Sequence, residues 1–528
     1  MKLYRILAIA AAVTLSSCIK DDTNLDFATL DKPVVSNLST TQEFKVAYND
    51  ELVVIPEIEY KDMNDLRYEW NIDGEIVSTE KDLHWVKTTT ADRQYGHFAL
   101  YRKSAGNADI YRFSITRYMP FERGFPIVAK KGGKTVIHFM KCIIGTTTAD
   151  VELLSNVAPI DVPETLAEGS RIVEYWDNSS TNVIGNLMLV TSDPNYCINL
   201  NGSSMDPENT LAQEFIDGNV PAGLQVKNVM PQHGYEGFVQ AQDGTMYNAF
   251  RGKGYFEGRY LNTPWKFGDQ AVKIDCLIPQ CNVTSMGASV CLLYDGTNHR
   301  FLIKDTQYST ATVPSTAGPT IEMIESDVDE AKQDKMIFCA NINMANTRDF
   351  EHMSYAQYWA LFKGTDGNYY ARQFWFDFNY HEIGAAENNY PETYIQIDDM
   401  NENSVIHVMP TFTTNYAHIY YTDGVDQKVL RVRKRDQDDL GEPAVFKEFD
   451  KEIVSVSSAC TQYMGFLCIC FKDGSVMLYN TQDYTLGASF TEFKEERVTL
   501  DSTDPEINAD LGEIVSCTYK WGKASAPK

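Results

Sequence analysis

The chain has 528 residues, with 73 Asp and Glu against 46 Lys and Arg, which gives a formal net charge of −27. This charge excludes nucleic acids and anionic lipid surfaces as partners, because both are bound through basic faces. The length predicts more than one domain.

The first residues predict a secretory signal. A short basic start leads into an apolar run over residues 6–15, which is too short to cross a bilayer. Leu15-Ser16-Ser17-Cys18 resembles a bacterial lipobox, in which the cysteine thiol is acylated and the chain is cut before it. We therefore expect residues 1–17 to be removed and Cys18 to carry a lipid anchor. An ordinary signal peptide with an incidental cysteine is the alternative.

The residues after Cys18 predict the destination of the chain. Lys20, Asp21 and Asp22 resemble the charged signal that directs lipoproteins of Bacteroidota to the outer leaflet. We therefore expect an outer-membrane protein that faces the extracellular side, with residues 18–30 as its lipidated tether. A solvated polar linker has the same composition and is the alternative.

The 11 cysteines do not predict a disulfide framework or a metal site. Several lie in apolar, strand-like runs, where a free cysteine behaves as a small hydrophobic residue; these are Cys197, Cys291, Cys339, Cys468 and Cys470. Cys468 and Cys470 fall on the same face of one strand, a poor geometry for bridging each other. Because no Cys-x-x-Cys pair occurs, we expect no metal and no cofactor. A bridge between Cys276 and Cys281 stays open.

Residues 31–119 predict a β-sandwich. Tyr68, Trp70 and Ile72 alternate along one strand, so their side chains point to the same face. Asp73-Gly74 then supplies a tight hairpin turn. Sandwich domains use a buried Trp on a central strand to fill the core between their sheets.

Together with an alternating strand over residues 108–116, this segment looks like a PKD/Ig-like domain. The lipobox, the Tyr-x-Trp-x-x-Asp-Gly strand and the long β-rich remainder resemble the PKD-like family of Bacteroidota lipoproteins. That resemblance implies association with an outer-membrane importer, made of a SusC-like TonB-dependent protein and a SusD-like lipoprotein, that takes up glycans or peptides.

Residues 120–528 contain an internal repeat. An apolar strand, a tight polar turn and a second strand recur seven times, and the turns begin at Gly132, Asp193, Asp243, Asp295, Asp366, Asp423 and Asp473. A four-stranded propeller blade needs roughly 40 to 50 residues, and these turns follow one another at about that interval or somewhat longer. The repeat predicts an all-β chain whose second domain is a seven-bladed β-propeller.

Two further repeats support the propeller. The strand Val229-Met230-Pro231 before the third hairpin matches Val408-Met409-Pro410 before the sixth. Near the end, Glu513-Ile514-Val515-Ser516 copies Glu452-Ile453-Val454-Ser455, which suits a ring closed by its own C-terminal strand. The alternative is that the hairpins belong to several sandwiches. Residues 319–335 break the pattern, and their near-helical spacing predicts a helical insertion.

Catalytic motifs are broken or missing, so the sequence does not predict an enzyme. His381-Glu382-Ile383-Gly384-Ala385 starts like a zinc-protease helix but has Ala at the second ligand position. Residues 436–441 resemble a calcium loop only in part. No nucleophile elbow, P-loop or dinucleotide fingerprint occurs. Aromatic side chains at Trp265, Trp375 and Tyr380 are the candidate ligand-binding residues, because a ring offers a platform to a sugar or an apolar side chain.

We therefore expect an accessory binding or scaffold subunit of a SusCD-type uptake system. The alternatives are a surface hydrolase that uses clustered carboxylates at the propeller channel, and an adhesin with a flat binding face. Fold alone does not decide among them, because propellers carry many unrelated functions.

Overall fold

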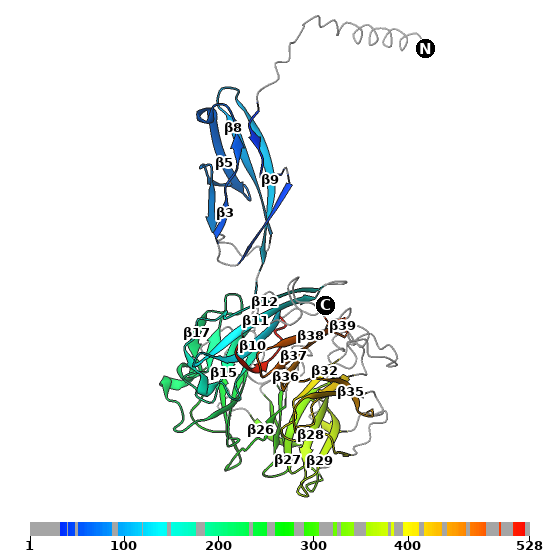
Figure 1. Cartoon of the computed structure of the whole chain (residues 1–528). Coiled ribbons are helices and arrows are strands. Elements are labelled where there is room, and N and C mark those ends of the chain that lie inside the picture. Colours follow the sequence, from blue (N-terminus) through cyan, green and yellow to red (C-terminus); the bar gives the residue numbers. More distant parts are fainter. Residues whose placement is uncertain are drawn as a thin grey trace, which may run out of the picture. The chain divides into compact units, whose positions relative to one another are not determined.

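The computed structural model divides the chain into two compact units, Met1–Tyr118 and Met119–Lys528 (Figure 1). The residues that the structure describes are 32–39, 41–47, 51–86, 93–118, 120–144, 149–175, 185–231, 236–250, 259–278, 290–305, 320–324, 329–342, 355–377, 382–384, 394–410, 417–435, 441–460, 465–481, 496–497 and 511–522. Within these ranges no helix has the length and hydropathy to span a membrane.

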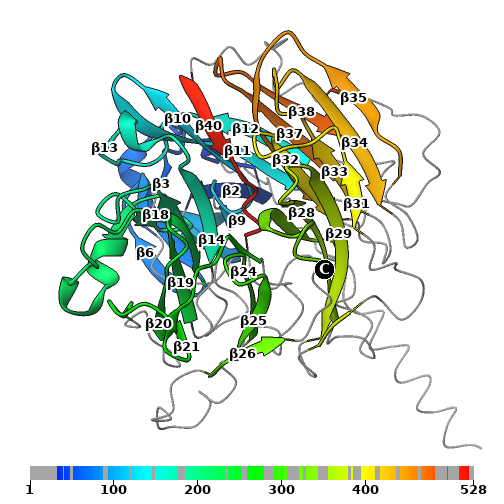
Figure 2. The ribbon, with the colours of Figure 1, turned by 90° about the horizontal axis from the view of Figure 1, so that it is seen from below.

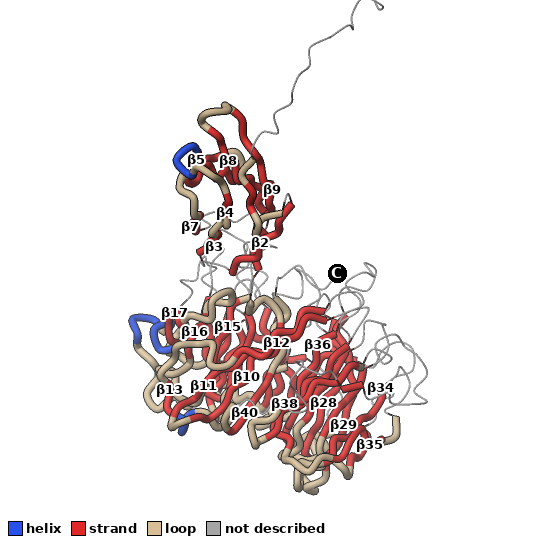
Figure 3. The backbone as a smooth tube through the Cα atoms, turned by 45° about the horizontal axis from the view of Figure 1, so that its top comes forward, coloured by secondary structure: helices blue, strands red, loops and turns tan. Residues whose placement is uncertain are grey.

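The described chain is all-β, as predicted (Figure 3). Its helical elements are four short 3₁₀ turns, η1 (Met63–Asp65), η2 (Glu164–Leu166), η3 (Leu211–Glu214) and η4 (Ile216–Gly218).

The N-terminal unit is built from one large sheet and two strand pairs. Its strands are β1 (Val34–Val35), β2 (Thr41–Ala47), β3 (Glu51–Val54), β4 (Ile58–Glu59), β5 (Leu66–Ile72), β6 (Glu75–Ser78), β7 (Leu83–Val86), β8 (Arg93–Arg102) and β9 (Asn107–Tyr118). The large sheet has the order β2-β9-β8-β5-β6, and β1-β4 and β3-β7 form the two pairs.

Trp70 fills the core of this unit, as predicted. Its side chain is fully buried, and its ring stacks on Phe98 with the ring centroids 4.3 Å apart. The indole N–H donates to the backbone carbonyls of Glu80 and Lys81, both at 3.2 Å. The predicted turn after β5 is present, with positive φ at Asp73 and Gly74, a conformation that glycine adopts at no steric cost.

Among the described residues the second unit contains one short strand pair and seven larger sheets, which we number in chain order. Sheet 1 joins β10 (Gly124–Lys131), β11 (Lys134–Ile144), β12 (Ala149–Leu154) and β13 (Val162–Pro163) to the C-terminal β40 (Glu513–Cys517). Sheet 2 consists of β14 (Arg171–Tyr175), β15 (Asn186–Val190), β16 (Ile198–Leu200) and β17 (Pro207–Thr210). Sheet 3 consists of β18 (Val226–Pro231), β19 (Glu236–Ala241) and β20 (Met246–Phe250).

Sheet 4 follows a short pair, β21 (Lys266–Phe267) and β22 (Gln270–Ala271). It consists of β23 (Cys276–Leu277), β24 (Val290–Asp295), β25 (Arg300–Asp305) and β26 (Thr320–Ile324). Sheet 5 consists of β27 (Lys335–Asn341), β28 (Tyr355–Lys363), β29 (Tyr369–Asp377), β30 (Glu382–Gly384) and β31 (Ile395–Ile397).

Sheet 6 consists of β32 (Ile406–Pro410), β33 (Ala417–Tyr421), β34 (Val429–Arg435) and β35 (Ala444–Glu448). Sheet 7 consists of β36 (Ile453–Cys460), β37 (Gly465–Phe471), β38 (Val476–Asn480) and β39 (Glu496–Arg497). All seven sheets are antiparallel wherever their strands pair.

The seven predicted hairpins are confirmed by strand pairing. Each is an antiparallel pair within one of the seven sheets, from β10 with β11 to β37 with β38. The turns share a local cause. In five of them the aspartate Oδ1 accepts a hydrogen bond from the backbone N–H two residues later, at 2.9–3.0 Å; the aspartates are Asp193, Asp243, Asp366, Asp423 and Asp473. A glycine with positive φ follows the last four of these aspartates.

Each sheet buries both of its faces against its neighbours. Leu187 and Leu189 of β15 pack with sheet 1, whereas Met188 and Val190 pack with sheet 3. Such strands appear in the sequence as unbroken apolar runs because neither face is left to water. Figure 2 shows the sheets following one another in chain order.

Seven core clusters join the sheets in sequence. Six of them join sheets 1 and 2, 2 and 3, 3 and 4, 4 and 5, 5 and 6, and 6 and 7. The seventh packs sheet 7 against sheet 1. In addition, β40 pairs with β10 in the register Ile127 with Cys517 and Lys130 with Glu513, so the predicted C-terminal strand does complete the first sheet.

The predicted helical insertion at residues 319–335 is wrong over the part that the structure describes, residues 320–324 and 329–335. Thr320–Ile324 forms β26 and pairs with β25, with Ile324 opposite Phe301. The available edge of sheet 4 therefore outweighs the weak helical spacing of the apolar residues, since strand pairing satisfies the backbone groups of both partners.

Candidate functional site

The first strands of the sheets carry half-exposed polar side chains. β14 contacts β18 and β40, β23 contacts β27, and β32 contacts both β27 and β36. Unlike the fully buried second strands, these strands present polar or ionisable groups at Arg171, Lys227, Cys276, Asn341, His407 and Ser455. We take these residues as the candidate site.

Arg171 and Lys227 form a cationic pair within this set. Arg171 is half-buried on β14 and Lys227 is exposed on β18. The Arg171 Nη2 donates to the backbone carbonyl of Lys227 at 3.3 Å, and the Lys227 Nζ donates to the carbonyl of Asp275 at 2.6 Å. Among the described residues neither cation has a carboxylate within salt-bridge distance. Burial lowers the pKa of Arg171, because its surroundings do not fully replace the water it loses.

Two ionisable groups lie next to this pair, Asp275 and Cys276. Burial raises the pKa of the Cys276 thiol to about 11, so this thiol is uncharged at neutral pH, and burial also raises the pKa of Asp275. The Asp275 Oδ2 accepts a hydrogen bond from the backbone N–H of Met336 at 3.3 Å, which fixes that carboxyl. Two cations thus lie beside a single carboxyl group, and an anionic group is the ligand chemistry they fit.

On the other face of β14, Glu174 binds the C-terminal segment. Its two carboxylate oxygens accept the backbone N–H groups of Trp521 at 2.6 Å and Gly522 at 3.0 Å. The fully buried Lys520 donates its Nζ to the carbonyls of Phe121 at 2.6 Å and Gly202 at 2.5 Å. Burial raises the pKa of Glu174 and lowers that of Lys520. All of these contacts hold backbone, so the pair serves the fold.

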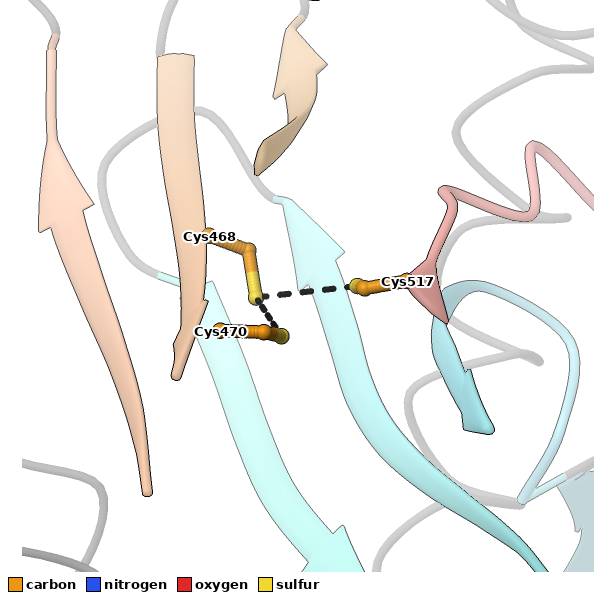
Figure 4. Close-up of side chains that lie close together, drawn as sticks. All are labelled: Cys468, Cys470 and Cys517. Carbon is orange, nitrogen blue, oxygen red and sulfur yellow. Dashed lines mark hydrogen bonds between the residues drawn. The ribbon is translucent and has the colours of Figure 1, made fainter. Parts of the chain in front are cut away.

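Three thiols converge between sheets 7 and 1 (Figure 4). The Sγ of Cys468 lies 3.9 Å from the Sγ of Cys470 and 3.8 Å from the Sγ of Cys517. All three sulfur atoms lie within 4.8 Å of one another. Among the described residues this is the group of side chains whose ligand atoms are close enough together to hold a metal ion.

The aromatic residues predicted as ligand platforms have different surroundings. Trp265 is 7 % exposed, packs edge-on against Phe238, and donates its indole N–H to the Asn248 Oδ1 at 2.6 Å. It is a core residue between sheets 3 and 4, so we do not keep it in the site. Trp375 is half-buried on β29, on the strand face opposite the buried Phe374 and Phe376.

The other predicted site residues lie outside the described residues. They are Cys18, Lys20, Asp21, Asp22 and Tyr380. The same holds for Cys281, for His381 of the broken protease motif and for residues 436–440 of the partial calcium loop. Of the predicted binding aromatics the structure therefore describes two, Trp265 between sheets 3 and 4 and Trp375 in sheet 5.

Sequence reasoning missed the cationic pair and the thiol cluster. Arg171 and Lys227 are 56 positions apart and meet only because their strands start neighbouring sheets. Their spacing is close to one repeat, and this is the signal that was available in the sequence. Cys517 lies 49 positions from Cys468 and joins it through the C-terminal strand that completes sheet 1.

Comparison with protein families finds one match over the N-terminal part of the chain. The model of the PKD-like family matches residues 18–158. The match covers less than half of the chain and extends from the predicted lipidation site to the end of β12. No curated protein matches the sequence.

Several solved structures resemble the chain at low identity. A quinonprotein alcohol dehydrogenase-like protein from Bacteroides thetaiotaomicron is 14% identical, with a TM-score of 0.37, over 85% of this chain and 94% of that one. AofleA from Arthrobotrys oligospora is 10% identical, with a TM-score of 0.32, over 67% and 90%. A post-proline cleaving enzyme from Rickettsia typhi is 11% identical, with a TM-score of 0.32, over 72% and 54%. These similarities are too distant to assign an activity.

Proposed function

We propose that the second unit is a closed, seven-bladed β-propeller and that the first is an Ig-like β-sandwich. The seven sheets, and the seven clusters that run from sheet to sheet and back to the first, support the propeller. Sharing one sheet between the two ends of the chain leaves no unpaired edge at the closure. In this arrangement the first strands line the central channel.

We propose that this channel binds an anionic group of an extracellular ligand. The observation that carries the proposal is the cationic pair, Arg171 and Lys227, which has no carboxylate partner among the described residues of a chain with a net charge of −27. Two cations left unpaired in a protein so rich in carboxylates fit the recognition of a carboxylate on a ligand. Acidic glycans and peptides with a free carboxyl group share this chemistry.

We infer binding rather than hydrolysis as the activity. A hydrolase of the carboxylate type needs two carboxyl groups free to act on one bond. Near the cationic pair, Asp275 is held by the backbone of Met336 and Glu174 by the backbone of Trp521 and Gly522. A hydrolase remains the alternative and requires a carboxylate pair elsewhere in the channel.

We further propose that the chain is a lipoprotein of the outer membrane, anchored through Cys18 and exposed through the signal at Lys20, Asp21 and Asp22. Its partners are then a SusC-like TonB-dependent importer and a SusD-like lipoprotein. The PKD-like family match, which starts at Cys18, supports this assignment. Acidic surfaces keep such proteins soluble at a crowded membrane.

Ligand binding is tested with the full-length chain in detergent by calorimetry. The probes are polygalacturonate against a neutral glycan of equal length, and a peptide with a free C-terminal carboxylate against its amide. We expect the charged member of one pair to bind, with an affinity that falls as salt is added. Binding of neither charged probe, or equal binding of a charged probe and its neutral counterpart, contradicts the proposal.

The matched variants change charge at the site and away from it. Arg171→Gln with Lys227→Gln is expected to weaken binding about 100-fold, because a hydrogen bond to a charged group contributes about 1.5–3 kcal/mol. Lys134→Gln is the control, since Lys134 is exposed and already paired with Asp161 at 2.9 Å. Equal affinities of the double variant and the control contradict a role for the cationic pair.

The partners are tested by affinity purification of the lipidated chain from gently solubilised outer membranes. Near-stoichiometric recovery of a TonB-dependent importer with its SusD-like partner supports the accessory role. Recovery of the chain alone, where a control importer complex stays intact, contradicts a stable complex. Cys18→Ala, which removes the acylated thiol, is expected to release the chain from the membrane.

A further inference from the structure

The three thiols at the junction of sheets 7 and 1 are brought together by the fold. Cys468 and Cys470 are two positions apart on β37, so the period of two sends both Sγ atoms to the same face. On that face β37 contacts β40, which carries Cys517. Ser455 of β36 fixes β40 here: its Oγ donates to the carbonyl of Cys517 at 3.1 Å and accepts the Cys517 N–H at 3.0 Å.

The separations of the sulfur atoms suit a single metal ion. Thiolate sulfur binds zinc at about 2.3 Å, so three sulfur atoms arranged in a plane around one ion lie about 4.0 Å apart. The two measured Sγ separations are 3.9 and 3.8 Å, and the third is below 4.8 Å. The ion therefore fits with rotations of the side chains and without movement of the strands.

The surroundings select a soft ion. Cys468 and Cys470 lie in a core cluster with apolar side chains that include Phe125, Ile127 and Leu478. Soft thiolates in an apolar pocket favour Cu(I) or Zn(II) over hard ions such as Mg²⁺ or Ca²⁺, which take oxygen ligands. Cys517, on the C-terminal strand, is partly exposed as a residue, whereas Cys468 and Cys470 are fully buried.

We propose that Cys468, Cys470 and Cys517 form a binding site for one thiophilic metal ion, Cu(I) or Zn(II), that ties β37 to the C-terminal strand β40. The Cys468 sulfur lies between the other two and within hydrogen-bond distance of both, and in each pair either sulfur atom can be the donor. Burial raises the pKa of Cys468 and Cys517 well above the usual range, so both carry their protons in the metal-free protein.

Binding is an exchange of protons for metal without electron transfer. Three metal–sulfur bonds form, the S–H bond of each cysteine that carries a proton breaks, and each of these protons passes to solvent. The affinity consequently rises with pH, by up to about tenfold per pH unit for each proton released. A thiol cluster that only packs the core has no such dependence.

Metal uptake by the full-length chain is the first measurement. The protein is purified in detergent under nitrogen with a phosphine reductant, treated with a chelator, and dialysed against Cu(I) held by a competing chelator or against Zn(II). We expect close to one ion per chain for at least one metal, counted by mass spectrometry. The control is the triple variant Cys468→Ser, Cys470→Ser, Cys517→Ser. The proposal is overturned if the wild type takes up no more metal than this variant.

Single variants locate the ligands. Replacing any one of the three cysteines by Ser is expected to weaken metal binding at least about 100-fold. Even mutations of residues that only hydrogen-bond to metal ligands lower metal affinity about 10–100-fold. Cys197→Ser is the matched control: Cys197 is as fully buried as Cys468 and Cys470, directly precedes β16 of sheet 2, and donates its Sγ proton to the Thr191 carbonyl at 3.2 Å, a contact that Ser can also make. An equal loss in the control overturns the assignment.

Two measurements on the wild type decide the question even if the variants do not fold. X-ray absorption of the loaded protein is expected to give three sulfur ligands at about 2.3 Å, with one additional oxygen ligand for Zn(II), which prefers four ligands; a set of ligands made mainly of nitrogen or oxygen overturns the site. Peptide mapping without reduction is expected to find free thiols in the metal-free protein. A disulfide between Cys517 and Cys468 or Cys470 in protein kept from oxygen, together with absent metal uptake, replaces the metal site with a covalent link.

Discussion

The two faces of strand β14 use polar groups in opposite ways. Towards sheet 3, Arg171 and Lys227 stand side by side with their charges unmatched by any described carboxylate. Towards sheet 1, Glu174 and Lys520 are surrounded by backbone groups to which they hydrogen-bond. Arg171 and Glu174 are three positions apart on one strand, so the alternation of side chains sends one to each neighbour.

The difference separates a binding face from a structural one. Charges that serve the fold have their hydrogen-bonding capacity satisfied within the protein, because a buried unpaired group is costly. Charges that serve a ligand keep part of that capacity for it. On this criterion the proposed ligand binds at the junction of sheets 2 and 3, and the contacts of the C-terminal segment with Glu174 and Lys520 are structural.

Lys520→Met gives the largest expected effect. The variant leaves the carbonyls of Phe121 and Gly202 without their buried donor. Each lost partner costs about 1–3 kcal/mol, so we expect the free energy of unfolding to fall by about 3 kcal/mol. Denaturant titration measures it, with Lys134→Met as the exposed control. Equal stability of the two variants contradicts a structural role for Lys520.

Neutralising the two charged residues of β14 one at a time sharpens the comparison of its two faces. We expect Arg171→Gln to lower the affinity for the anionic ligand at least about tenfold while leaving the free energy of unfolding nearly unchanged. Glu174→Gln should do the reverse, because its oxygens bind the backbone of Trp521 and Gly522. Calorimetry and thermal unfolding of both variants provide the two readouts. If Glu174→Gln lowers the affinity for the ligand, the two faces belong to one site and the distinction between them is wrong.

The fold was predictable where its signal is local and repeated. Asp-Gly turns have their own hydrogen bonds, as in Asp473, whose Oδ1 accepts from the Ser475 N–H. Apolar runs such as 187–190 report burial on both sides, so seven hairpins and a buried Trp70 could be found without coordinates. The prediction for residues 320–324 was wrong because the spacing of their apolar residues is ambiguous, and pairing with the edge of β25 determines their structure.

The candidate site was not predictable in the same way. Arg171 meets Lys227, and Cys468 meets Cys517, across neighbouring sheets, and no local pattern encodes which strands of different sheets touch. Trp265 illustrates the opposite error. Turn-rich sequence around it indicated an exposed ring, but the hydrogen bond of its indole to Asn248 allows the whole side chain to be buried.

The smallest expected effect concerns acid, and it tests whether the first strands are shielded from water along their whole length. Burial lowers the pKa of His407 on β32 from 6.5 to about 4, and its Nε2 lies 2.7 Å from the Ser458 Oγ. The unfolded chain therefore takes up this proton near pH 6.5, whereas the folded chain resists it until about pH 4. The stability that this group contributes is present above pH 6.5 and is lost as the pH falls towards 4.

Between pH 7 and pH 4.5 we expect the free energy of unfolding of the wild type to fall by on the order of 1 kcal/mol more than that of His407→Gln. Ser458→Ala, which removes the hydrogen-bond partner but no titrating group, should lower stability equally at both pH values. Parallel stability curves for the wild type and His407→Gln would mean that water reaches the first strands of sheets 6 and 7, and that these strands are as open to a ligand as the cationic pair.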